Sequence, residues 1–225
     1  MTVTEAPISE DFRVTASIFT PSDVAFLANL DRKMVANWTK PHKSGLPVIT
    51  TARKGYGPNP PTIPLFGLTD AVAMHSLLEV GVTPRRAAGL AREQKQVDPF
   101  FFAREDFLTD GAEFYRRLKT DGIERVRDRQ QAFAEVLEPF VRNVTFADGL
   151  VKSYVVADLG WDRVIIDPYF NAGRPCLEES KTPIFPILAQ ADNGENRKTI
   201  ALDYDLEVHE VTSIVDHAER YREVA

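Results

Sequence analysis

The chain has 225 residues, of which 44% are apolar and 27% are charged, and its formal net charge at pH 7 is −6. These proportions are typical of globular proteins and exclude wholesale disorder. No apolar run approaches the roughly 18 residues of a membrane span, and the acidic N-terminal segment does not resemble a secretory signal. The single cysteine, Cys176, excludes an intrachain disulfide and a multi-cysteine zinc site. We therefore expect a cytoplasmic protein that does not contact the membrane.

The charge is unevenly distributed along the chain. Residues 21–96 contain ten Lys and Arg against five Asp and Glu, a net charge of +5. Residues 161–225 contain seven Lys and Arg against thirteen Asp and Glu, a net charge of −6. A basic block on an acidic body is typical of a protein in which one part binds a polyanion such as DNA. A chance imbalance of five charges is the alternative.

The first predicted elements are two short helices. Residues 20–23, Thr-Pro-Ser-Asp, have the pattern of a capping box with proline at the first helical position. Asp31 is the expected N-cap of a second helix over residues 32–38, in which Val35 and Trp38 should face the core. The residues of this helix that should point outward are Arg32, Lys33 and Asn37.

A β-hairpin is predicted next, with one strand at residues 48–52 and a returning strand at residues 62–65. Two further helices should follow, one capped by Thr69-Asp70 and one beginning at Thr83-Pro84. This order of elements is that of a winged helix-turn-helix. We expect it to span residues 20–96, after a flexible lead-in over residues 1–19.

A winged helix-turn-helix would place helix 32–38 in the major groove of DNA. There Arg32, Lys33 and Asn37 can contact base edges and phosphates, because a guanidinium can bind guanine bidentately and a carboxamide can bind adenine. The tip of the wing would contact the backbone or the minor groove through Arg53, Lys54 and Tyr56. A solvated amphipathic helix followed by a structural hairpin is the alternative.

Residues 97–160 are predicted to connect two domains. Short strands are expected around Phe101 and Phe107, a helix over residues 130–141, and a hairpin that turns at Asp148-Gly149. Residues 161–225 should form a helical domain, with helices near residues 184–191, 197–204 and 208–222. The expected fold class is α+β and mostly helical.

No pattern in the chain indicates catalysis. The histidines lack the spacing of a metalloprotease, and the glycines near Gly55 lack the Lys-Ser/Thr of a phosphate-binding loop. Asp203 and Asp205 fit a solvated acidic loop better than a metal site, and Cys176 fits an inert packed thiol. We therefore expect no enzymatic activity, no metal and no cofactor.

Residues 164–184 contain the most specific motif of the sequence. An apolar strand ends in Asp167-Pro168, and Gly173-Arg174-Pro175 and then Ser180-Lys181-Thr182-Pro183-Ile184 follow. This pattern resembles the small helical domain of bacterial antitoxins of VapB type, and residues 20–96 resemble the MerR-like head of the longer members. One departure is that the family's Gly-Thr-Arg-Ile segment has no glycine here, although a cation and a hydroxyl are kept.

The resemblance implies an antitoxin of a type II toxin–antitoxin system. Such a protein would neutralise a PIN-domain ribonuclease and repress its own operon by binding operator DNA. An inhibitor can insert a cation among the carboxylates of the nuclease, or cover the RNA groove with an acidic surface. The candidate toxin-binding cations are Arg174, Lys181, Arg220 and Arg222. The residues expected to shape the turns of the motif are Asp167, Pro168, Gly173, Pro175 and Pro183.

Two further expectations concern assembly and function. A homodimer is expected because one recognition helix contacts only a few base pairs. Its interface would include the aromatic stretch of residues 100–115, unless that stretch forms the core that joins the two domains. The alternative function is a free-standing MerR-like regulator with a C-terminal sensing or dimerisation domain.

Overall fold

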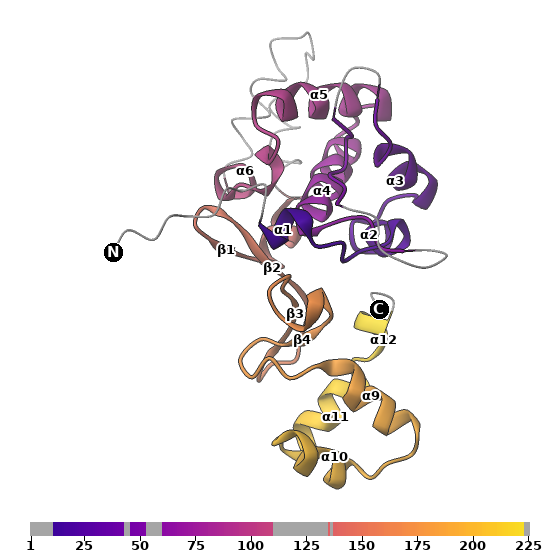
Figure 1. The fold of residues 1–225 in the computed structure, drawn as a ribbon, viewed down its shortest axis with the longest axis vertical. Helices are drawn as coiled ribbons and strands as arrows, with labels where there is room; N and C mark the ends of the chain where they lie inside the picture. Colours follow the sequence, from indigo (N-terminus) through magenta and orange to yellow (C-terminus); the bar gives the residue numbers. More distant parts are fainter. Residues whose placement is uncertain (1–10, 43–45, 53–59, 110–134, 136, 223–225) are drawn as a thin grey trace. The chain divides into compact units, whose positions relative to one another are not determined.

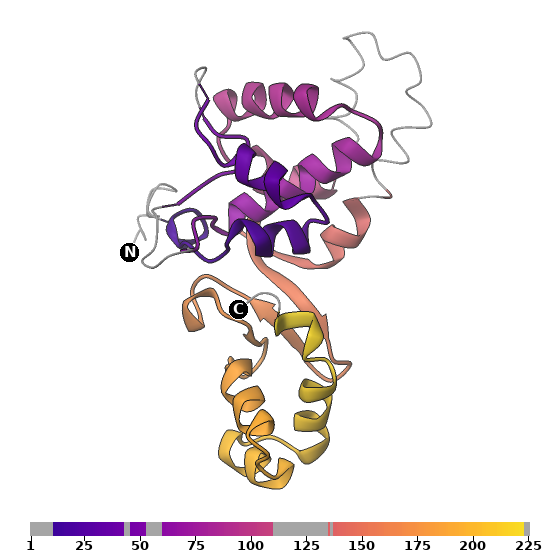
Figure 2. The ribbon, with the colours of Figure 1, turned by 90° about the vertical axis from the view of Figure 1, so that its right-hand side faces the viewer.

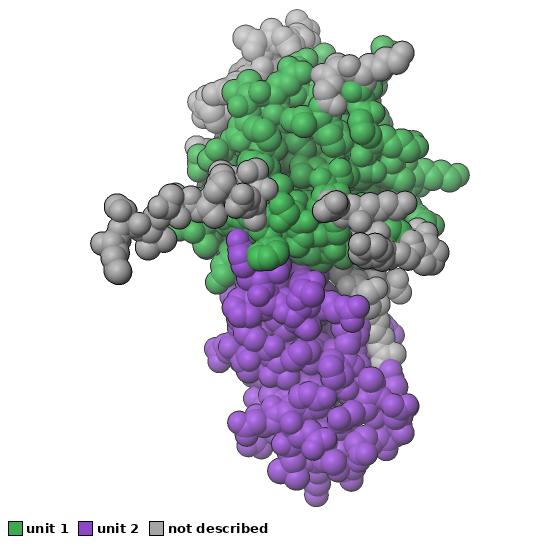
Figure 3. Space-filling model, viewed as in Figure 1, with its two compact units in different colours: residues 1–152 green, residues 153–225 purple. Residues whose placement is uncertain are grey.

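The computed structural model describes residues 11–42, 46–52, 60–109, 135 and 137–222 of the chain. The fold is α+β and mainly helical, as predicted (Figure 1). The chain divides into two compact units, Met1–Lys152 and Ser153–Ala225, which are coloured separately in Figure 3. Each unit is described by itself below.

Unit 1 is built around the helix α4 (Leu65–Glu79), which is buried along most of its length. α4 packs against α1 (Phe12–Thr15), α2 (Pro21–Leu27), α5 (Pro84–Val97) and a short 3-10 helix (Phe101–Ala103), and Figures 1 and 2 show it at the centre of these elements. The remaining described helices of unit 1 with complete bounds are α3 (Arg32–Trp38), which packs on α2, and α6 (Glu105–Thr109). An apolar helix surrounded on all sides is a core helix.

The starts of α2 and α3 confirm the local sequence prediction. The Thr20 backbone N–H donates to Asp23 Oδ2 at 2.6 Å, and the Asp23 N–H donates to Thr20 Oγ1 at 3.3 Å, which completes the capping box. Asp31 caps α3 by accepting a hydrogen bond from the Met34 N–H at 3.0 Å. Val35 and Trp38 are buried, as their spacing predicts.

The prediction of two wing strands is wrong for the residues that the structure describes. Residues 48–52 form no strand. Of residues 62–65, where the returning strand was expected, Ile63 forms only an isolated bridge with Phe19, and Leu65 begins α4. The Ala52 N–H still donates to Thr62 O at 2.8 Å. The Thr50 N–H instead donates to the Asp70 carboxylate at 2.7 Å. A side chain thus accepts the backbone hydrogen bond that a neighbouring strand would otherwise accept. α4 and residues 48–52 lie close together at Gly67, since a Cβ there would lie 2.4 Å from Thr50 O.

Two other predictions in unit 1 are corrected. Thr69 and Asp70 do not cap α4 but lie inside it, fully buried. Phe101 lies in the 3-10 helix and Phe107 in α6, not in strands. Phe102 packs on both, with ring centroids 5.2 Å from Phe101 and 5.1 Å from Phe107. Phe102 and Phe107 therefore belong to the interior of unit 1, because both are buried, whereas Phe100 and Phe101 are partly exposed.

The predicted middle hairpin is confirmed. Residues 137–142 are helical and lead into β1 (Val144–Ala147), which neighbours β2 (Leu150–Asp158) in the sheet. Asp148 and Gly149 both have positive φ angles, 55° and 71°, as a two-residue hairpin turn requires. The sheet continues in the order β1-β2-β3-β4, with β3 (Arg163–Ile166) antiparallel to both β2 and β4 (Cys176–Leu177).

Unit 2 packs helices on the last part of this sheet. Its core joins Val164 and Leu177 of the strands to residues of α9 (Ile184–Asp192), α10 (Arg197–Tyr204) and α11 (Val208–Asp216). The three predicted helices are confirmed. The last one is interrupted after Asp216 and resumes as α12 (Glu219–Arg222), where the Tyr221 hydroxyl is buried and donates to the carbonyl of Ile214.

Candidate functional site

The predicted DNA-contacting side chains of α3 lie on its solvent-exposed face. Arg32, Lys33 and Asn37 are exposed, and the opposite face is buried against α2. The carboxamide oxygen of Asn37 accepts a hydrogen bond from Lys40 Nζ at 2.9 Å. α3 has only seven residues, so it is about 10 Å long. The other predicted DNA contacts, Arg53, Lys54 and Tyr56, lie outside the described residues.

A second basic helix face, which the sequence prediction did not include among the contacts, lies on α5. Arg85 and Arg86 are exposed in its first turn, whereas Ala87, Ala88 and Ala91 face the core. The sequence does contain a signal for these two arginines. The spacing of the three alanines indicates the buried side of the helix, so the arginines lie on the exposed side.

Lys95 is a cation of unit 1 that is almost fully buried, and the sequence analysis assigned it no role. Its Nζ donates to Asp70 Oδ2 at 2.7 Å, to Thr50 Oγ1 at 2.8 Å and to the carbonyl oxygen of Val48 at 3.2 Å. An ammonium group has three protons, so its donor capacity is filled. Lys95 therefore ties α5 to α4 and to the irregular segment at residues 48–50.

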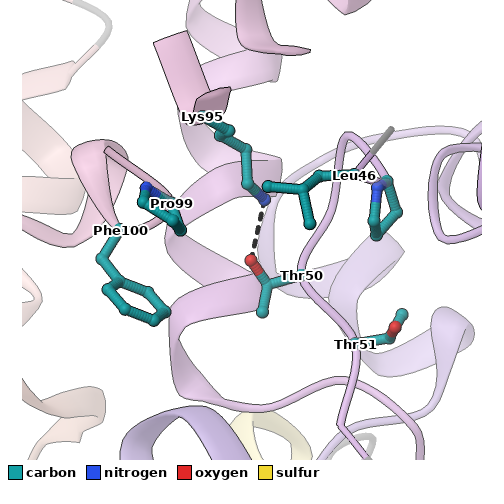
Figure 4. A pocket seen from close by; sticks show the side chains of 7 residues that line it. Leu46, Thr50, Thr51, Lys95, Pro99 and Phe100 are labelled. Atoms are coloured by element: carbon teal, nitrogen blue, oxygen red, sulfur yellow. Dashed lines mark hydrogen bonds between the residues drawn. The ribbon is translucent and has the colours of Figure 1, made fainter. Parts of the chain in front are cut away.

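A cavity of about 220 Å³ lies beside Lys95 (Figure 4). The two threonines that line it supply hydroxyl groups, and the rest of its wall is mainly apolar. Because the protons of Lys95 are already shared among three oxygens, the cavity offers a ligand few polar groups. Its lining residues are Leu46, Pro47, Thr50, Thr51, Lys95, Pro99 and Phe100.

The motif of unit 2 forms a tight loop after β3. Asp167 is fully buried, and its Oδ1 accepts a hydrogen bond from the Tyr169 N–H at 3.0 Å. Asn171, Ala172 and Gly173 follow with positive φ angles of 47°, 53° and 74°. Such a run of left-handed residues needs support from its surroundings. Pro168 and Pro175 are buried at the two ends of the loop, and Pro183 is the N-cap of α9.

The four predicted toxin-binding cations differ in their surroundings. Arg174 is exposed after the loop, and Arg220 is exposed on α12. Lys181 is half-buried, with its Nζ 4.7 Å from the ring centroid of Phe170, a cation–π contact. No hydrogen bond, ion pair or ring contact in the described part of unit 2 joins these three cations to one another. The Arg222 side chain lies outside the described residues.

Cys176 lies in β4 beneath this loop and is fully buried. Burial raises the pKa of its thiol to about 11, and the charge of Lys181 opposes this effect. A thiol with this pKa stays protonated near neutral pH, which makes it a poor nucleophile and metal ligand. Among the residues that the structure describes, no group of three or more His, Cys, Asp and Glu side chains could hold a metal ion.

No helix in the described ranges is long and apolar enough to cross a membrane. No protein-family model matches the chain. It is 23% identical to the Mycobacterium tuberculosis protein named "Putative antitoxin VapB45", over 92% of this chain and 95% of that protein. Its structure is similar to the crystal structure of Rv2018 from Mycobacterium tuberculosis, with a TM-score of 0.70 and 22% identity, over 91% of this chain and all of that one. The chain thus has the fold of Rv2018 and is similar over most of its length to a protein with an antitoxin's name.

Proposed function

We propose that the protein is a non-enzymatic antitoxin of a type II toxin–antitoxin system. The observation that carries this proposal is the sequence similarity to a protein named as an antitoxin, which extends over both units of the chain. A similarity confined to one unit would support only a shared DNA-binding or helical domain. The match over both units supports a shared arrangement of a regulatory part and a partner-binding part.

In this proposal unit 2 binds the toxin, a PIN-domain ribonuclease. Such a nuclease gathers carboxylates around a divalent metal ion, so its inhibitor needs a cation for those carboxylates or a surface that covers the RNA groove. The loop of unit 2 presents Tyr169 and Phe170, which are 53% and 38% exposed, next to the exposed Arg174. Aromatic and arginine side chains dominate the binding energy of protein interfaces. Arg174 is therefore the first of the candidate cations to test.

Unit 1 binds operator DNA in the same proposal. The net charge of residues 21–96 is +5, and exposed cations lie on both α3 and α5. A homodimer is proposed because one recognition helix contacts only a few base pairs, and a dimer binds two half-sites of an operator. Phe102 and Phe107 are excluded from its interface, since both are buried within unit 1.

Co-expression tests the toxin-binding proposal. The full chain is produced with the product of the open reading frame that adjoins its gene, and the RNase activity of that product is measured with and without the chain. We expect a stable complex in which RNA cleavage is suppressed. A nuclease that stays active with the chain in excess would contradict the proposal. DNA binding that responds to a small molecule, without any suppression, would favour a free-standing regulator.

A further inference from the structure

The cavity beside Lys95 is large enough for one aromatic ring. Its volume is about 220 Å³, whereas an apolar cavity of roughly 150 Å³ in another protein is enough to bind benzene. Figure 4 shows Pro99 and Phe100 on one side of Lys95 and Leu46 on the other. Leu46 is 42% exposed and Thr51 is also exposed, so a small molecule can reach the cavity from solvent.

The apolar walls of the cavity are held in place by contacts within unit 1. The ring of Phe100 packs edge to face on the buried Phe66, with ring centroids 5.5 Å apart, and its backbone N–H donates to Asp98 Oδ1 at 3.0 Å. Pro47 and Pro99 carry rings that fix their own backbone φ angles. A ligand therefore binds with little loss of conformational freedom in the wall, and the apolar faces of these rings suit a flat apolar molecule.

The positive charge of Lys95 does not make the cavity a site for anions. Its Nζ lies 2.7 Å from Asp70 Oδ2, so the two charges compensate each other. Its three protons are shared among Asp70, Thr50 and the carbonyl oxygen of Val48. An anionic ligand would leave water without gaining a free proton or an uncompensated positive charge, and this transfer is unfavourable. The cavity therefore favours a neutral molecule.

Thr50 supplies one polar group that a ligand can use. Its Oγ1 accepts a hydrogen bond from Lys95 Nζ at 2.8 Å, and its own hydroxyl proton has no acceptor among the residues that the structure describes. A hydroxyl group can donate one hydrogen bond while it accepts another. A carbonyl or ether oxygen on the ligand would provide the missing acceptor. An apolar wall with a few polar groups that fix orientation is typical of a small-molecule site.

We propose that this cavity binds a small, neutral aromatic molecule that carries one oxygen acceptor, with this oxygen bound to the Thr50 hydroxyl. The proposal is independent of the proposed toxin and DNA binding. The Ile49 N–H donates to Trp38 O at 3.1 Å, so the segment that lines the cavity is also held to the end of α3. A ligand that contacts this segment and α5 together stabilises unit 1, because it binds the folded chain and not the unfolded one.

Three probes of similar shape test the chemistry of the site by isothermal titration calorimetry of the full chain. Acetophenone has one ring and a carbonyl oxygen, α-methylstyrene has a CH₂ group in place of that oxygen, and benzoate carries a charge. We expect acetophenone to bind with a Kd on the order of 0.1–1 mM. α-Methylstyrene should bind about 2- to 10-fold more weakly, since it cannot accept a hydrogen bond, and benzoate should not bind. Equal affinity for all three probes, or no binding of acetophenone, would overturn the proposal.

Two matched variants test the location of the site. Leu46→Trp places a large side chain at the mouth of the cavity and should abolish acetophenone binding. Leu202→Trp, at a position of α10 that is 84% exposed, is the control and should bind acetophenone as the wild type does. Acetophenone should also raise the Tm of the wild type and of the control but not that of Leu46→Trp, and a circular dichroism spectrum shows that each variant is folded. A folded Leu46→Trp variant that binds acetophenone with unchanged affinity would show that the molecule binds elsewhere and would overturn the proposal.

Discussion

Lys95 Nζ lies 2.7 Å from Asp70 Oδ2, and both side chains are almost fully buried, at 2% and 3% exposure. The two residues lie 25 positions apart in the sequence and belong to different helices, α5 and α4. Thr50 and Val48 complete the coordination of the ammonium group. This contact thus determines at once the packing of α5, the path of residues 48–50 and the face that α5 presents to solvent.

The first prediction concerns this ion pair. Lys95→Met should lower the free energy of unfolding by about 3–5 kcal/mol, because it leaves the Asp70 carboxylate buried without its counter-charge. Urea denaturation of the full chain measures the change. Lys198→Met, at an exposed lysine of α10, is the control and should have little effect. The double variant Asp70→Leu with Lys95→Met should recover part of the loss; a single variant as stable as the wild type would show that the pair contributes little.

The second prediction compares two glycines, Gly81 in the turn between α4 and α5 and Gly89 inside α5. Gly81→Ala should destabilise the protein by about 1–2 kcal/mol, because φ at this position is positive. Gly89→Ala should instead stabilise it by about 0.5–1 kcal/mol, because this position is helical and no described residue lies within 4 Å of the added Cβ. Thermal unfolding of both variants measures the difference. Equal effects of the same sign would contradict the positive φ of Gly81 and the helical conformation of Gly89.

The third prediction concerns the reactivity of Cys176. With a pKa of about 11, roughly one thiol in a thousand is ionised at pH 8 in the folded protein. Labelling by a disulfide reagent should therefore be slow in buffer and fast in urea. The raised pKa also stabilises the fold below pH 9, the ordinary pKa of this thiol, and this contribution should be lost between pH 9 and 11. Rapid labelling of the folded chain at pH 8 would contradict the burial of the thiol.

The fourth prediction concerns the proposed toxin surface. Arg174→Ala and Phe170→Ala should each weaken binding of the adjoining gene's product by on the order of 30-fold, the effect of a central interface residue. Isothermal titration calorimetry of the full chain measures it. Lys198→Ala removes an exposed cation elsewhere in unit 2 and serves as the control. If Arg220→Ala has the large effect instead, the contact lies on α12 and the assignment to the loop is wrong.

Much of the local structure could be predicted from the sequence, because the contacts that form it lie a few residues apart. The capping box of Thr20 and Asp23, the N-cap Asp31 and the turn at Asp148-Gly149 are all of this kind. Their hydrogen bonds and φ angles depend on residue type and spacing, and both can be read from the sequence. The three helices of unit 2 follow from apolar periodicity for the same reason.

The tertiary structure alone decided the features on which the candidate sites depend. Residues 48–51 are β-branched and resemble a strand, but Asp70, twenty residues away from Thr50, accepts the N–H that a strand partner would bind. Thr69-Asp70 resembles a helix cap, but the apolar residues before it extend α4 back to Leu65. Lys95 resembles a solvated cation in the sequence, but in the structure its ammonium group donates to Asp70 and Thr50. In each case a contact between distant segments outweighs the local preference, because a buried polar group must find its partner wherever the fold places one.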